Sequence, residues 1–70
     1  MENIEDLKPF LTPIFCRASM SIALCKFYGD KPSQTRYIDQ AGMILKQARK
    51  DGVIRFYEGR ERSTYYEFVK

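Results

Sequence analysis

The strongest constraint on the fold is a helical apolar pattern between residues 37 and 48. Its apolar members fall on one side of a helix with about 100° between successive residues: Tyr37, Ile38, Ala41, Ile44, Leu45 and Ala48. The opposite side is polar and mostly basic, and it holds Arg36, Asp39, Gln40, Met43, Lys46, Gln47 and Lys50. The pattern predicts a helix that buries one face and exposes a basic one.

Both ends of this helix carry termination signals. Ser33 can cap the free amides of a first turn, and Pro32 keeps helix from running in from upstream. Gly52 suits the left-handed residue that often closes a helix, so the predicted helix spans residues 33–51. Glycine inside a helix costs about 1 kcal/mol relative to alanine, which makes Gly42 a candidate break between two shorter helices.

Two segments after Gly52, residues 53–58 and 64–69, are rich in β-branched and aromatic residues. A short link with a glycine joins them, which predicts an antiparallel hairpin. Four side chains of equal parity are expected to face the helix: Ile54, Phe56, Tyr66 and Phe68. Three arginines are expected to point outward or to sit at the tip: Arg55, Arg60 and Arg62.

The same stretch contains a long helix that ends in Asp51-Gly52-Val53-Ile54, an arginine-rich tip at Gly59-Arg60-Glu61-Arg62, and a returning Tyr65-Tyr66-Glu67-Phe68. This order, over roughly residues 30–70, resembles the second half of a winged helix-turn-helix domain. The resemblance implies an α+β fold with two to three helices followed by a C-terminal antiparallel β-hairpin, the wing. That superfamily includes DNA readers, RNA binders and protein-interaction modules, so a likeness of fold does not by itself assign a function.

The N-terminal half predicts two more helices. Residues 2–11 are expected to form a short helix or turn that Asn3 caps. Thr12-Pro13 is expected to open a second helix, because proline at the first helical position loses no hydrogen bond. This helix is predicted to run from residue 13 to residue 28 and to stop at Gly29, with a tight turn at residues 30–32. Residues 1–70 are expected to form a single domain.

The second helix is apolar almost all round, since only Arg17 and Lys26 are charged. A helix of this kind is buried on more than one side. The part left uncovered is a candidate interface for a homodimer or for a protein partner, and it includes Phe15, Met20, Phe27 and Tyr28. The open alternative is that Phe10, Leu11 and the hairpin cover it.

Composition argues against catalysis and against bound cofactors or metals. The chain has no histidine, the usual general base near neutral pH. Cys16 and Cys25 have no activating neighbour in sequence, form no zinc site, and are expected on opposite sides of one helix as buried, reduced thiols. The N-terminus is acidic rather than signal-like, and no run approaches the ~20 apolar residues of a membrane span. We expect a cytoplasmic, non-enzymatic protein with no membrane contact.

Charge placement favours nucleic acid as the partner. Residues 31–70 carry nine basic and five acidic side chains, against three and four in residues 1–30, and basic surfaces of this kind suit phosphate. We predict a small regulator of transcription that binds double-stranded DNA through helix 33–51 and the wing, with Arg36 on guanine and Gln40 on adenine. The predicted contact residues are Gln34, Thr35, Arg36, Gln40, Met43, Lys46, Lys50, Arg55, Arg60 and Arg62.

The competing hypothesis is a phage or mobile-element protein that keeps this fold but binds and modulates a host protein. Aromatic residues are enriched at protein interfaces, and the chain has five tyrosines. RNA is a third partner, since exposed tyrosines on the ribbon would stack on bases, but no feature of the sequence selects it.

Overall fold

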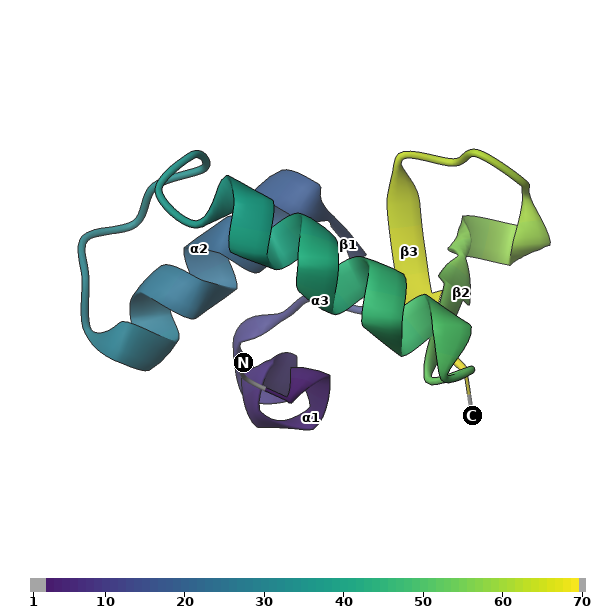
Figure 1. Ribbon diagram of the computed structural model, residues 1–70, viewed down its shortest axis with the longest axis horizontal. Coiled ribbons are helices and arrows are strands. Elements are labelled where there is room, and N and C mark those ends of the chain that lie inside the picture. The colour runs from purple at the N-terminus through teal and green to yellow at the C-terminus, as the bar shows by residue number, and fades with distance from the viewer. Residues whose placement is uncertain (1–2, 70) are drawn as a thin grey trace.

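The computed structural model describes residues 3–69. Its elements are α1 (Ile4–Leu7), the 3-10 turn η1 (Lys8–Phe10), β1 (Ile14–Cys16), α2 (Arg17–Tyr28), α3 (Ile38–Lys50), β2 (Ile54–Phe56), the 3-10 turn η2 (Tyr57–Gly59) and β3 (Tyr65–Phe68). Three helices and a three-stranded antiparallel sheet make an α+β domain (Figure 1). This architecture is compatible with a small winged-helix-like domain.

The sheet has the order β1-β3-β2, so the last strand of the chain lies in the centre. The predicted hairpin is present as β2 and β3, in a register that pairs Ile54 with Phe68 and Phe56 with Tyr66. Its strands are shorter than predicted, because η2 turns the chain at Tyr57 and places Glu58 in the left-handed region at φ 56°. The long link therefore begins two residues before Gly59.

The prediction that residues 14–16 open the second helix is wrong, because they form β1 and pair with β3. Burial alternates along them as in a strand: Phe15 is fully buried, whereas Ile14 is 40% exposed. The Phe15 ring lies 5.3 Å from that of Phe68 and 6.4 Å from that of Tyr66, centroid to centroid. A buried aromatic contact across the sheet thus overrides the local helix-start signal of Thr12-Pro13. Gly29 ends α2 as predicted, at φ 80°.

The predicted start of the long helix is also wrong, since α3 begins at Ile38 rather than at Ser33. Ser33 does act as a cap, and its Oγ accepts from the backbone amides of Thr35 and Arg36 at 3.2 and 3.0 Å. It caps a turn rather than α3. The Oγ of fully buried Ser21 donates to the carbonyl of Ser33 at 2.9 Å and accepts from the amide of Tyr37 at 3.1 Å. These two bonds fasten the turn to α2 before α3 can begin.

The helix does not break at Gly42, which lies inside a continuous α3. At the other end the amide of Gly52 donates to the carbonyl of Arg49, and the amide of Val53 donates to that of Ala48, at 3.1 and 2.9 Å. With Gly52 at φ 77°, this pattern is a Schellman motif. The predicted closing role of Gly52 is confirmed.

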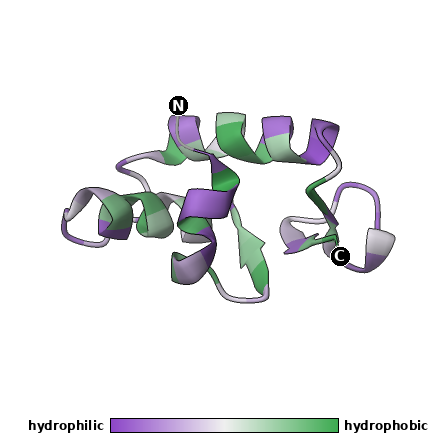
Figure 2. Cartoon of the chain, turned by 90° about the horizontal axis from the view of Figure 1, so that it is seen from below, coloured by the Kyte–Doolittle hydropathy of each residue, from purple (hydrophilic) through white to green (hydrophobic). Residues whose placement is uncertain are grey.

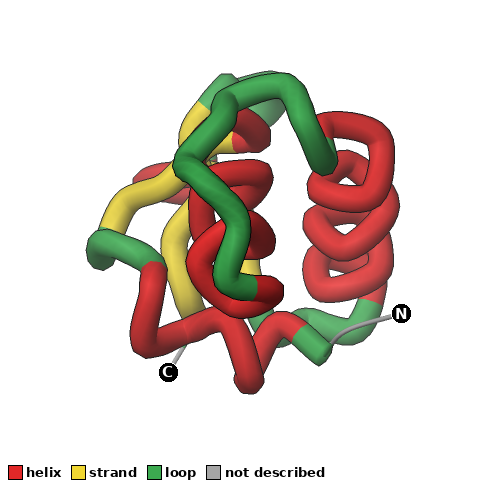
Figure 3. The backbone as a smooth tube through the Cα atoms, turned by 90° about the vertical axis from the view of Figure 1, so that its left-hand side faces the viewer, coloured by secondary structure: helices red, strands yellow, loops and turns green. Residues whose placement is uncertain are grey.

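The core lies between α1, α2, α3 and the inner face of the sheet, as the three views of the backbone show (Figures 1, 2 and 3). The predicted apolar face of α3 is buried at Ala41, Ile44, Leu45 and Ala48. The predicted inward face of the hairpin is confirmed for buried Ile54 and for Tyr66 and Phe68, which pack on the core. Phe56 is half-buried and stacks on Tyr66. Leu7 and Ile4 complete it from α1, which Asn3 caps through the amide of Glu5.

Burial divides the four predicted interface residues of the second helix. Phe15 and Met20 are fully buried, so their assignment to an exposed interface is wrong: β3 and the neighbouring helices already cover them. Phe27 and Tyr28 remain exposed, at 40% and 41%. Within residues 3–69, none of the helices combines the length and the apolarity that crossing a membrane requires.

Candidate nucleic-acid interface

Helix α3 forms an outer layer of the molecule, and in Figure 2 it lies along the top. Its apolar residues turn inward, which leaves Asp39, Met43, Lys46, Gln47 and Lys50 exposed on the outer side. The turn that precedes α3 lies at one end of this layer. Strand β2 and η2 lie at the other end, beside the C-terminal half of the helix (Figure 1).

At the first end, Arg36 is engaged with the protein, and the predicted contact residues Gln34 and Thr35 lie outside the helix. Arg36 Nε lies 3.3 Å from Asp30 Oδ2, and its guanidinium lies 5.5 Å from the centre of the Tyr37 ring. A hydrogen bond with Tyr37 and the charge of Asp30 raise the pKa of Arg36. Gln34 and Thr35 are exposed but lie in the turn, outside α3. The structure thus removes these three residues from the helical face that was predicted to carry them.

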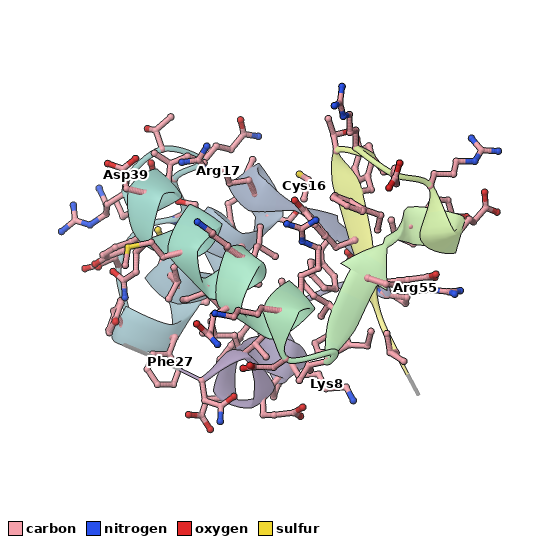
Figure 4. All side chains as sticks on the ribbon, turned by 45° about the vertical axis from the view of Figure 1, so that its right-hand side comes forward. Lys8, Cys16, Arg17, Phe27, Asp39 and Arg55 are labelled. Atoms are coloured by element: carbon pink, nitrogen blue, oxygen red, sulfur yellow. The ribbon has the colours of Figure 1, made fainter. Side chains whose placement is uncertain are left out.

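Two further groups on α3 are also partnered at this end. The Nε2 of half-buried Gln40 donates to the hydroxyl of Tyr28 at 3.1 Å. Asp39 lies 3.6 Å from Arg17 Nη2, with 98% of its side chain exposed. Figure 4 shows this pair at the N-terminal end of α3. A carboxylate here repels phosphate, so the first turn of α3 is a poor surface for the DNA backbone.

Cations without carboxylate partners gather in the C-terminal half of α3. We call Lys46, Arg49 and Lys50 the α3 basic patch; together they line a surface depression of about 400 Å³. No carboxylate among residues 3–69 lies within ion-pairing distance of any of the three. The guanidinium of Arg49 lies 4.6 Å from the centre of the Phe56 ring. This contact links the patch to β2 and fixes one of its cations against the sheet.

The hairpin arginines differ from one another. Arg55 Nε donates to Glu67 Oε2 at 2.7 Å, and in Figure 4 it points away from α3. Arg60 lies 3.6 Å from Glu58. Arg62 is exposed, and it holds a left-handed backbone at φ 63°. Non-glycine residues rarely adopt this conformation, so Arg62 is presented to solvent at a local energetic cost.

The structure therefore brings together Lys46 and Lys50 of the predicted set and adds Arg49, which was not among the predicted contact residues. Its side chain reaches Phe56, four residues past Gly52, and no periodicity within the helix reveals this contact. The signal that could have found it is the Lys-x-x-Arg-Lys spacing, which puts three cations on adjacent turns of one helix.

Among the described residues, no group of three side chains is arranged to hold a metal ion. Cys16 lies on β1 and only Cys25 on α2, so their expected placement on one helix is wrong; both thiols are free, and Cys16 is only half-buried. Burial of Cys16 opposes the thiolate, but hydrogen bonds from Ser19 and from the Ala18 backbone outweigh it, and the pKa is lowered.

The turn between α2 and α3 departs from the resemblance. It spans residues 29–37, whereas a helix-turn-helix joins its helices through three or four residues. No protein-family model, curated protein or solved structure matches this chain.

Proposed function

We propose that this protein binds double-stranded DNA through the α3 basic patch, with Arg62 of the β2–β3 loop as an outlying phosphate contact, and that it acts as a regulator of transcription. The observation that carries the proposal is the clustering on one helix of three cations that have no carboxylate partner among the described residues. Arg17, Arg36, Arg55 and Arg60 each face a carboxylate. The three cations of the patch are exposed to solvent, on a helix whose apolar face is buried in the core.

This geometry changes how the helix would meet the duplex. In a helix-turn-helix, the N-terminal residues of the recognition helix contact bases. Here the first turn carries an exposed carboxylate, Asp39, and the cations lie two turns later. The C-terminal half of α3 therefore supplies the phosphate contacts, which favours affinity for the backbone over sequence reading from residues 34–36.

Salt dependence of binding to a random duplex tests the proposal. Each phosphate contact contributes about −0.9 to the slope of log K against log salt. The double variant Lys46→Gln/Lys50→Gln should lower the magnitude of this slope by about 1.8. The matched control is Lys26→Gln/Lys31→Gln, which removes two exposed lysines at the other end of the molecule and should leave the slope unchanged. Absence of duplex binding at low salt, or equal losses in both variants, would overturn the proposal.

One observation favours a protein partner instead. Phe27 and Tyr28 are both exposed and meet edge to face, with centroids 5.4 Å apart. Such a pair at the end of α2 suits an interface anchor. If this site governs function, whether in a homodimer or on a host protein, Phe27→Glu should abolish the complex and leave a folded monomer. Sedimentation of the wild type and of Phe27→Glu shows whether the complex is lost and the variant is a folded-size monomer.

A further inference from the structure

Met43 is the most exposed large apolar residue of the described chain, with 56% of its surface accessible. A single exposed apolar side chain is ordinary on a protein surface. The surroundings of Met43 are not apolar, however, because it lines a depression of about 330 Å³ with Lys46, Gln47 and Lys50. The apolar side chain of Met43 therefore lies next to two cations, Lys46 and Lys50. Such a surface suits a partner that has an apolar group surrounded by negative charge.

The spacing places Met43 on the same face of α3 as the two lysines of the α3 basic patch. Residues 43, 46 and 50 stand at i, i+3 and i+7, so their side chains share one face of α3. Met43 lies on the N-terminal side of the two lysines, towards exposed Asp39. Asp39 stands seven residues before Lys46 on the same face, so the two lysines would meet phosphate further along the helix, and Met43 lies between Asp39 and Lys46.

The polar side chains that could read bases nearby are already engaged. Gln40 donates to Tyr28, and Gln47 Nε2 donates to Asp51 Oδ1 at 2.9 Å. Arg36 is held by Asp30 ahead of the helix. Of the residues expected to face the major groove, Met43 is thus the one that α3 itself presents in the open.

We propose that Met43 contacts the C5-methyl group of thymine in the major groove and gives this surface a preference for thymine. The inference rests on the proposed DNA binding and adds a residue that determines specificity. Thymine is distinguished in the major groove by its methyl group, and apolar side chains recognise it there. The flexible thioether of methionine adapts to such a contact without a fixed hydrogen-bond geometry.

The test compares two duplexes that differ only in this methyl group, one of alternating dA and dT and one of alternating dA and dU. Wild-type protein should bind the thymine duplex about two- to fourfold more tightly, the range expected for one partly or fully buried methyl group. Met43→Ala should bind both duplexes equally and keep the wild-type salt slope. Gln47→Ala is the matched control on the same face and should keep the thymine preference.

Each result bears on one claim. Equal binding of the two duplexes by wild type, or a preference that survives in Met43→Ala, overturns the role of Met43 and leaves DNA binding standing. Failure of wild type to bind either duplex at low salt overturns the proposed function, and the thymine contact with it. Circular dichroism verifies that the variants are folded, which the exposure of both positions favours.

Discussion

The guanidinium of Arg17 covers the backbone of Gly42. A β-carbon at position 42 would lie 2.9 Å from Arg17 Nε, closer than such atoms approach, and 3.1 Å from its Cζ, so the guanidinium would have to move. The same Nε donates to the carbonyl of Ile38 at 3.0 Å. Glycine in the middle of α3 is therefore explained by a side chain of α2 that crosses over it.

This relationship predicts that Gly42→Ala changes the stability by different amounts in two backgrounds. In wild type, the gain of about 1 kcal/mol in helix propensity should be offset by the loss of the Arg17 hydrogen bond, about 1 kcal/mol. With Arg17→Ala already present, the same substitution should stabilise the protein by about 1 kcal/mol. Urea unfolding of the four proteins in the cycle measures the coupling. Equal stabilisation in both backgrounds would show that Arg17 does not restrain position 42.

The helix pattern and its glycine stops could be predicted because both depend on residues close in sequence. Gly29 and Gly52 end their helices through bonds to carbonyls within five residues. Strand β1 could not be predicted in this way, since Phe15 pairs with Tyr66, far along the chain. Ser33 could be predicted only in part for the same reason. Its capping bonds are to nearby residues, whereas the hydrogen bond from Ser21, which holds the segment as a turn, comes from a distant part of the chain.

Ser21→Ala should destabilise the protein by about 1–3 kcal/mol, because one backbone group loses its side-chain partner and a second keeps only the weak bond from the Cys25 thiol. Those groups are the amide of Tyr37 and the carbonyl of Ser33. The control is Thr35→Ala in the same turn, an exposed position where a change within about 0.5 kcal/mol is expected. Thermal and urea unfolding measure both. A Ser21→Ala protein as stable as the control would refute the anchoring role of this hydroxyl.

The site was harder to predict than the fold, because its location depends on which cations find carboxylates. Asp30 lies six residues from Arg36, and Glu67 lies twelve from Arg55, yet both pairs form. Only the folded chain separates these paired arginines from Lys46 and Lys50. The sequence shows a basic half but not which of its charges remain available to a partner.

Cys16 should be alkylated in the native protein, whereas fully buried Cys25 should react only on unfolding. The pKa of Cys16 is lowered in the folded state: burial acts against this, and the bonds from Ser19 and the backbone prevail. The alkylation rate should therefore rise at a lower pH than for a thiol in an unfolded peptide. Ser19→Ala should move this midpoint upward. Mass spectrometry of the modified peptides, at a series of pH values, measures both effects.

The sign of the corresponding stability effect follows from the lowered pKa. The folded protein releases the Cys16 proton at a lower pH than the unfolded chain does. The thiolate contribution is therefore absent below the folded pKa, grows as the pH rises, and is complete above the unfolded pKa. Cys16→Ser should remove this rise, while Cys25→Ser should retain it. Urea unfolding across this pH range decides the matter, and a rise that persists in Cys16→Ser would contradict the assignment.

A comparison of Arg62→Asn with Arg60→Asn distinguishes the effect of backbone strain on stability from the effect of losing a charge in the β2–β3 loop. Arg62→Asn removes one cation at a left-handed residue, φ 63°, where asparagine is tolerated better than most side chains. Arg60→Asn removes one cation at an ordinary extended residue, φ −79°, together with an exposed ion pair of small value. Arg62→Asn should therefore be at least as stable as wild type and up to about 1 kcal/mol more stable than Arg60→Asn. The same two variants also test DNA binding. If Arg62 contacts phosphate, Arg62→Asn should lower the magnitude of the salt slope of duplex binding by about 0.9. Arg60, held by Glu58, should change that slope less, and the reverse order would place the phosphate contact at Arg60.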